Sequence, residues 1–180
     1  MSNPETADRA VAVRRATATD ARAIAEINVT GWQAAYRGLM PDAFLDSLSV
    51  EHRERAWRAR LESGTDAGDP AWVAEIGGEP VGYLVSGTPR DDDAGATAAE
   101  IYAVYVRPDT WRSGAGRRLM DTAVDEWWRR GATTLLLWVL EGNRRARAFY
   151  EALGWVADGS RKTYDMGGFT TLEVRYRLKR

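Results

Sequence analysis

A turn rich in glycine and arginine joins a strand-like stretch to a helix-like stretch in VYVRPDTWRSGAGRRLM, residues 104–120. Gly114 and Gly116 lack a Cβ, so an anion can come close to the backbone there. The first turn of a helix offers N–H groups without partners and a partial positive charge, both of which favour a phosphate. Arg112 and Arg117 add charge. The turn is therefore a candidate pyrophosphate site, although a lone G-x-G is more typical of a flexible connection with solvated arginines.

Two common nucleotide-binding motifs do not fit this turn. A dinucleotide fingerprint needs a third glycine where Leu119 stands, and a P-loop needs Gly-Lys followed by Ser or Thr. The chain has no cysteine, and His52 is its single histidine. Thiolate chemistry is thus excluded, and we expect neither a histidine-centred triad nor a metal site.

The elements around the turn predict an α/β fold. Residues 99–106 and 133–140 are apolar and strand-like, and the helical stretch 114–130 lies between them. If the two strands share a sheet, this unit is a right-handed crossover between parallel strands. Ligands of such units gather at the carboxyl ends of the strands, where the glycine turn lies.

The flanking segments complete the pattern. We predict a first strand at 11–16, a helix that Thr17 and Asp20 open as a capping box, and an interruption of that helix at Gly31. A second short helical segment follows, and then a helix over 49–63 with Ser49 as N-cap. The remaining expected elements are a hairpin at 71–87, a short helix at 143–154, and one or two closing strands that include 171–179.

Composition limits the partners. The 180 residues, 44% hydrophobic and 28% charged, are typical of one soluble domain, and no run approaches the ~18 apolar residues of a membrane span. The net charge of −1 argues against nonspecific nucleic-acid binding and favours local anion sites. Residues 1–10 lack the apolar stretch of a secretion signal, so we expect a short disordered tail, a domain over 11–180, and a cytoplasmic location.

Two longer segments resemble a known family. EIYAVYVRPDTWRSGAGRRLM followed by LLLWVLEGNRRARAFYEALGWV is similar to the acetyl-coenzyme A core of the GNAT N-acetyltransferase superfamily, over residues 100–156. One departure falls on the turn, where Trp111 stands at the family's first Gln or Arg and Arg112 follows one place late. The residues in register after the turn are Asn143, Ala146, Phe149, Tyr150, Gly154 and Trp155.

The resemblance implies a fold and a cofactor site. The fold would be a single α/β domain, with a mixed, mostly antiparallel sheet of about seven strands, helices on both faces and a central parallel pair. Acetyl-CoA would be the cosubstrate and coenzyme A the product, with the pantetheine arm paired alongside 104–106 and a backbone N–H polarising the acetyl oxygen. The implied cofactor-binding residues are Val104, Tyr105, Val106, Arg112, Ser113, Gly114, Ala115, Gly116, Arg117, Asn143 and Phe149.

Acetyl transfer to an amine needs a base for the amine and an acid for the departing thiolate. The family often has a carboxylate base four residues before the position of Val104, which is Glu100 here. Tyr150 matches the tyrosine that faces the cofactor sulfur, and its phenol can donate a proton at neutral pH. The structural alternatives are a solvated glutamate at a strand end and a tyrosine packed in the core.

The acceptor side is expected between the first helices and the strand ends. Trp32, Tyr36, Tyr83 and Tyr102 would form aromatic walls suited to a small-molecule amine, although some of these rings must belong to the core. A protein N-terminus or lysine is an alternative acceptor, and a noncatalytic acyl-CoA-binding module is an alternative of another class. An unrelated phosphate-binding domain is a third. The family also makes a homodimer possible, through a sheet edge or a terminal strand.

Overall fold

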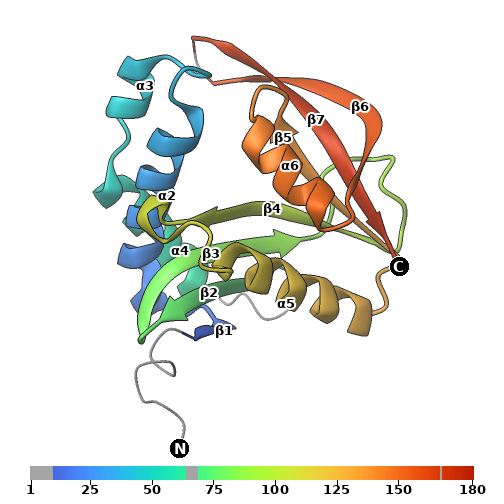
Figure 1. Ribbon diagram of the computed structural model, residues 1–180, viewed down its shortest axis with the longest axis horizontal. Helices are drawn as coiled ribbons and strands as arrows, with labels where there is room; N and C mark the ends of the chain where they lie inside the picture. The colour runs from blue at the N-terminus through green and yellow to red at the C-terminus, as the bar shows by residue number, and fades with distance from the viewer. Residues whose placement is uncertain (1–9, 64–68, 167) are drawn as a thin grey trace, which may run out of the picture.

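The computed structural model describes residues 10–63, 69–166 and 168–180. The expected tail at 1–10 lies outside these residues except for Ala10. A seven-stranded sheet runs through the molecule in the order β1-β2-β3-β4-β5-β7-β6, and β4 and β5 form its parallel pair (Figure 1). This confirms the predicted mixed sheet. The strands are β1 (Val11–Arg15), β2 (Ala71–Ile76), β3 (Glu79–Gly87), β4 (Ala98–Val106), β5 (Thr134–Leu140), β6 (Val156–Asp165) and β7 (Thr170–Lys179).

Helices cover both faces of the sheet, as predicted. In Figure 1 α2, α3 and α4 group on one side, and α5 and α6 on the other. The α2 and α4 side packs Ile24, Ile27 and Leu61 against the sheet, whereas α5 buries Leu119 and Met120 on the opposite face. The helical segments are η1 (Ala18–Asp20), α2 (Ala21–Tyr36), α3 (Asp42–Asp46), α4 (Val50–Glu62), η2 (Pro108–Thr110), α5 (Ala115–Arg129) and α6 (Arg144–Ala152). No helix in the described ranges is both long and apolar enough to cross a membrane.

The prediction that Gly31 interrupts the first helix is wrong, because α2 continues without a break to Tyr36. The glycine instead allows a close approach between α2 and β4. A Cβ at this position would lie 3.1 Å from Cδ1 of Tyr105, tighter than ordinary van der Waals contact. The missing side chain is thus explained by packing rather than by a turn.

The closing segment forms two strands, of which β6 has no strand-like burial pattern of its own. Most of its residues are exposed, including Val156 at 67%. It pairs with β7 on one side and forms an edge of the sheet. An edge strand with two solvated faces lacks the alternation of apolar and polar residues, so residues 156–165 show no pattern that predicts a strand.

The parallel strands β4 and β5 separate at their carboxyl ends. Their register begins at Ala98↔Thr134 and ends at Ile101↔Leu137. Beyond that point β4 stays paired with β3, while β5 stays paired with β7 as far as Leu140. The two halves of the sheet therefore diverge, and they leave the inner edge of β4 open.

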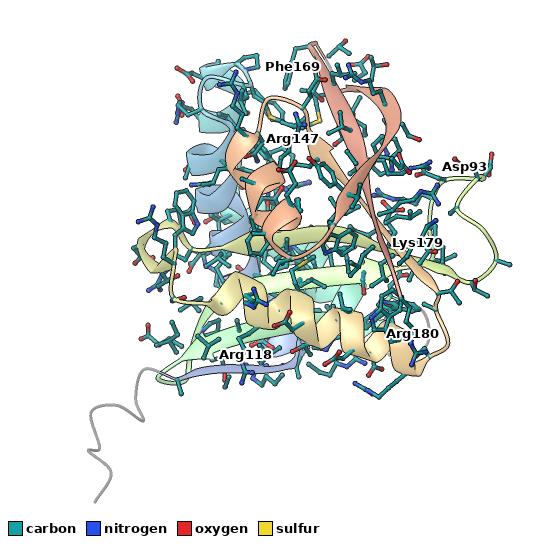
Figure 2. All side chains as sticks on the ribbon, turned by 45° about the vertical axis from the view of Figure 1, so that its right-hand side comes forward. Asp93, Arg118, Arg147, Phe169, Lys179 and Arg180 are labelled. Carbon is teal, nitrogen blue, oxygen red and sulfur yellow. The ribbon has the colours of Figure 1, made fainter. Side chains whose placement is uncertain are left out.

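A buried arginine fixes the loop that leads from β3 into β4. Arg175 of β7 lies 3.0 Å from the Asp91 carboxylate, 2.6 Å from that of Asp93 and 2.7 Å from that of Asp158 on β6. Asp93 is labelled on this loop in Figure 2. The Trp138 indole N–H on β5 also donates to Asp91, at 2.8 Å. The β3–β4 loop, β5 and the β6–β7 hairpin are thus joined around one guanidinium.

Replacing Arg175 by Met should leave Asp91 without its guanidinium partner, and Asp93 and Asp158 with Arg177 alone. We expect a loss of about 3 kcal/mol in the free energy of unfolding, because breaking a buried ion pair from one side is strongly destabilising. Urea unfolding followed by circular dichroism measures the loss. Arg161→Met is the control, since that exposed arginine pairs with Glu141 and its loss should cost under about 1 kcal/mol. Equal losses in the two variants would contradict this account.

Candidate active site

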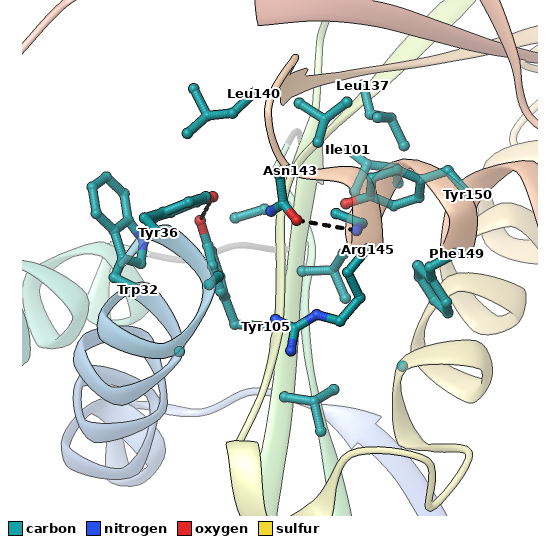
Figure 3. Close-up of a pocket in the computed structure, with 18 of the residues that line it drawn as sticks. Trp32, Tyr36, Ile101, Tyr105, Leu137, Leu140, Asn143, Arg145, Phe149 and Tyr150 are labelled. Carbon is teal, nitrogen blue, oxygen red and sulfur yellow. Dashed lines mark hydrogen bonds between the residues drawn. The ribbon is translucent and has the colours of Figure 1, made fainter. Parts of the chain in front are cut away.

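A cavity of about 930 Å³ occupies the space where β4 and β5 diverge (Figure 3). Its volume lies in the range of small-molecule and cofactor pockets. The backbone of the turn at 110–117 lines one part, and aromatic side chains from α2, β4 and the β6–β7 hairpin line another. The cavity therefore joins the predicted anion site to the predicted acceptor site.

The glycine turn has the geometry of an anion cradle. All six predicted turn residues, 112–117, line the cavity. Gly114 is the N-cap of α5, with a φ of 91°, and Arg112 also has a positive φ, of 69°. A Cβ on Gly116 would lie 3.4 Å from the ring of Phe149. A Cβ on Gly114 would meet nothing within 4 Å. The first turn of α5 thus borders open space at the cavity, so these residues fit a pyrophosphate.

Trp111, the departure from the family pattern, ties the turn to its neighbours. Its indole N–H donates a hydrogen bond of 2.8 Å to the Val106 carbonyl at the end of β4. The Arg145 guanidinium of α6 lies 3.3 Å from the centre of its ring. Arg145 lines the cavity, and burial lowers its pKa. It makes no ion pair with any described residue, so an arginine that the sequence analysis did not select is available to an anionic ligand.

The open edge of β4 presents backbone groups to the cavity. The Arg107 N–H donates to the Val81 carbonyl on β3 at 2.8 Å. Because successive residues of a strand direct their N–H and C=O groups to opposite sides, those of Val104 and Val106 point away from β3 and into the gap. The bond from Trp111 to Val106 agrees with this alternation. Both valines line the cavity, as does the intervening Tyr105.

Asn143 both caps a helix and lines the cavity. Its Oδ1 accepts a hydrogen bond of 3.1 Å from the Ala146 N–H and so caps the first turn of α6 (dashed in Figure 3). Its amide nitrogen remains a donor at the cavity wall. Phe149, one turn further along α6, also lines the cavity and lies beside Tyr150, with ring centres 5.4 Å apart.

Tyr150 lines the cavity from α6, and its hydroxyl points towards Asn143 in Figure 3. The ring packs against Trp155 and Tyr176, with ring centres 6.4 and 6.3 Å away. Burial raises the pKa of the phenol far above its usual value. Tyr150 is therefore a neutral O–H donor at physiological pH, held by core packing with its polar end in the cavity.

Glu100 is placed differently from what we expected of a base. It is fully buried and does not line the cavity. The Arg90 backbone N–H donates to its Oε2 at 2.9 Å, and the Arg90 guanidinium binds its Oε1. The guanidinium, not the carboxylate, reaches the cavity wall. Glu100 thus positions Arg90. The place of Glu100 in its strand could not reveal a partner that lies in the preceding loop.

Aromatic side chains form the wall nearest to α2. The Trp32 and Tyr36 rings meet edge to face at 5.2 Å, and the Tyr36 hydroxyl lies 2.8 Å from that of Tyr105. All three residues line the cavity. Burial raises the pKa of both tyrosines, so this wall is uncharged. The Trp32 indole N–H is buried and has no hydrogen-bond partner among the described residues.

Of the other two tyrosines expected at the acceptor side, the cavity includes one. Tyr102 lines it, beneath the Arg90 guanidinium at 4.7 Å, and burial raises its pKa to about 12. Tyr83 does not line it. It is buried in the core on β3, where the side-chain amide of Asn28 donates to its hydroxyl at 2.5 Å. Tyr105, its partner in the β3–β4 register, lies at the cavity wall instead.

Several lining residues were not selected from the sequence. Most of the charged and aromatic ones come from the neighbouring strands β5, β6 and β7, whereas Arg90 comes from the β3–β4 loop and Arg145 from α6. The alternation of the closing strand was visible, but its partner strand was not. The charged and aromatic members of this group are Arg90, Trp138, Arg145, Lys162, Tyr164 and Glu173. The described residues contain no group of three or more possible metal ligands.

Comparison with known proteins identifies the family. The model of the acetyltransferase (GNAT) family matches residues 32–155. The chain belongs to this family. A GNAT acetyltransferase is an acyltransferase that uses acetyl-CoA, so the predicted recognition, enzyme class and cosubstrate are confirmed.

Curated relatives of this GNAT chain include proteins with different acceptors. A probable N-acetyltransferase of Mycobacterium tuberculosis is 29% identical, over 94% of both chains. An L-amino acid N-acyltransferase of Escherichia coli is 30% identical, over 81% of this chain and 80% of that protein. The ribosomal protein bS18-alanine N-acetyltransferase of Escherichia coli is 39% identical over 66 residues, which are 37% of this chain and 45% of that protein.

Solved structures share the GNAT fold. The PaiA N-acetyltransferase of Thermoplasma acidophilum, in complex with coenzyme A, aligns with a TM-score of 0.71 over 95% of this chain and 99% of that one, at 17% identity. YncA of Salmonella typhimurium, with acetyl-CoA, aligns with a TM-score of 0.67 over 94% of both chains, at 24% identity. The architecture is therefore that of GNAT enzymes.

Variants at Asn143 should separate its two roles. Asn143→Ala removes the cap of α6 and should lower the free energy of unfolding by about 1 kcal/mol. Asn143→Asp keeps an oxygen acceptor for the cap but removes the amide donor, so it should fold normally. We expect both variants to bind acetyl-CoA about 3- to 10-fold more weakly, the value of one hydrogen bond. Urea unfolding and calorimetric titration measure the two quantities. Wild-type affinity in the Asp variant would rule out the donor role.

Proposed function

We propose that the protein transfers the acetyl group of acetyl-CoA to the primary amine of a small molecule. The observation that carries this proposal is that one cavity contains both the anion cradle and an enclosed aromatic wall. The wall of Trp32, Tyr36 and Tyr105 can hold the apolar part of an amine, and its cation as well, through the ring faces.

The backbone binds the cosubstrate in this proposal. The N–H groups at 112–117 hold the pyrophosphate, and Arg145 adds a positive charge beside them. The groups of Val104 and Val106 on the open edge of β4 pair with the pantetheine arm, and one of their N–H groups polarises the acetyl oxygen. Asn143 donates to a pantetheine amide. Bound acetyl-CoA supplies the thioester.

Tyr150 is the proposed acid and a carboxylate the proposed base. The departing thiolate needs a proton, and a neutral phenol can deliver one from the position that Tyr150 occupies. The amine must lose a proton before it attacks, because an amine with a pKa near ~10 is mostly charged at neutral pH. We predicted Glu100 for this task, and its pairing with Arg90 limits it to an action through that residue.

A protein acceptor is the second candidate. The relative that acetylates the alanine of ribosomal protein bS18 supports it, but that similarity covers 37% of this chain. The relative that acylates L-amino acids covers 81% and supports a small molecule instead. A noncatalytic acyl-CoA-binding module would retain the cradle and transfer nothing.

The test is a titration followed by an assay. Calorimetry with acetyl-CoA, coenzyme A and NADH should give saturable binding to the first two and none to NADH. Release of free thiol is then followed with phenethylamine, L-phenylalanine, L-methionine and the peptide Ala-Ala-Ala-Ala. Turnover with the small amines supports the proposal, turnover with the peptide alone favours the protein acceptor, and binding without turnover favours the noncatalytic module.

Tyr150→Phe should lower kcat at least 100-fold and leave the Kd for acetyl-CoA within about twofold of wild type, because only proton delivery is lost. Thiol release measures kcat, and calorimetry measures the Kd. Tyr164→Phe is the matched control: this tyrosine also lines the cavity but is half exposed, on β6. Unchanged turnover in Tyr150→Phe would refute the acid role.

A further inference from the structure

We propose that Glu173 is the residue that takes the proton from the acceptor amine. It is the single acidic side chain among the described residues that line the cavity. Nothing in the family motifs selects it, since it lies in the closing strand, outside residues 100–156. This inference rests on the proposed function and names a catalytic residue for it.

The sheet register carries Glu173 to the reacting end of the cavity. On β7 it stands opposite Leu140, the last residue of β5. Asn143 follows three residues later and opens α6, the helix that carries Tyr150. Leu140, Asn143, Tyr150 and Glu173 all line the same cavity. A carboxylate and a phenol therefore face one space from two adjacent elements.

The charges around Glu173 suit a base. The Lys162 ammonium on β6 lies 3.7 Å from the Glu173 carboxylate. Three further charged or titratable groups face Glu173, namely Arg90 from the β3–β4 loop, Glu100 from β4 and Tyr36 from α2. Burial raises the pKa of Glu173, and the positive charges of Lys162 and Arg90 oppose that rise. The group is thus a stronger base than an exposed carboxylate, and Lys162 favours its ionised form.

Glu100 cannot take this role directly. Its two oxygens accept from the backbone and the guanidinium of Arg90, and it lies outside the cavity lining. Among the described residues Glu173 forms one ion pair, with Lys162, whose side chain is itself one-third exposed. A flexible lysine can move aside for an ammonium ion, whereas the Arg90 clamp includes a fixed backbone N–H.

The proton balance of the reaction closes with these two residues. A proton passes from the ammonium group of the acceptor to the Glu173 carboxylate. The freed amine nitrogen bonds to the acetyl carbon, the C–S bond breaks, and the Tyr150 hydroxyl gives its proton to the departing sulfur. The new amide nitrogen loses its second proton to the Tyr150 oxygen. Glu173 then releases its proton to water, so one proton is released per turnover.

The experiment is a pH profile of kcat/KM, from pH 5 to 10, for wild type and four variants, with whichever of the four amine probes wild type acetylates fastest. Glu173→Gln should lose at least 100-fold in kcat at pH 7. Its activity should recover at high pH, where the amine loses its proton in solution. The Kd for acetyl-CoA should stay within twofold of wild type. Glu141→Gln, a carboxylate at the end of β5 that does not line the cavity, should keep the wild-type profile.

Two further variants separate a base from a structural residue. Lys162→Met removes a charge that lowers the pKa of Glu173, so the acidic limb of the profile should move to higher pH. Glu100→Gln should keep that limb and move it to lower pH, because it removes a negative charge that raises the pKa of Glu173. A merely structural Glu173 would predict no shift of the limb in Lys162→Met.

The outcomes are distinct. If wild type acetylates none of the probes, the proposed function fails, and the role of Glu173 fails with it. If wild type is active and Glu173→Gln keeps its kcat and its acidic limb, the inference about Glu173 alone is overturned. If Glu100→Gln and not Glu173→Gln abolishes the limb, Glu100 is the base after all.

Discussion

The separation of β4 from β5 is the constraint on which the rest of the structure depends. After Ile101↔Leu137 each strand keeps one partner and loses the other. Backbone groups that a continuous sheet would satisfy are then free to bind a ligand, and they cannot remain unpaired in a dry core without cost. The gap must therefore be polar, accessible and bordered by helix ends, and α5 and α6 both begin at its rim.

Holding the gap open requires rigidity on both of its sides. On the β4 side, the packing of α2 against Tyr105 depends on the absence of a side chain at Gly31. On the β5 side, Arg175 joins β7, β6 and the β3–β4 loop through three carboxylates. Gly31 and Tyr105 line the cavity themselves, whereas Arg175 acts from outside its lining. The loop that Arg175 holds also carries Arg90, so the same anchor sets one wall of the cavity.

The sequence was sufficient for the parts of the molecule that depend on local pattern. The glycine turn, the crossover from β4 to β5 and the short helix that follows β5 are each contained in one continuous stretch, and the structure has all three. It was insufficient where a residue's role depends on a distant partner. Glu100 has the spacing of a base, but Arg90 binds it from a loop ten positions earlier. Glu173 could not be selected before β7 was known to lie beside β5, and Gly31 was misread because Tyr105 was not yet its neighbour.

Main chain lines one end of the cavity, and side chains line the other. The cradle at 112–117 consists of main chain in a fixed conformation, which many side-chain changes would leave intact. The proposed acceptor end is made of side chains contributed by α2, β4, β5 and the β6–β7 hairpin. Mutations can thus alter what is acetylated without disturbing the donor of the acetyl group. Acceptor choice can therefore evolve independently of acetyl-CoA binding. The β6–β7 hairpin is a place to begin redesigning specificity.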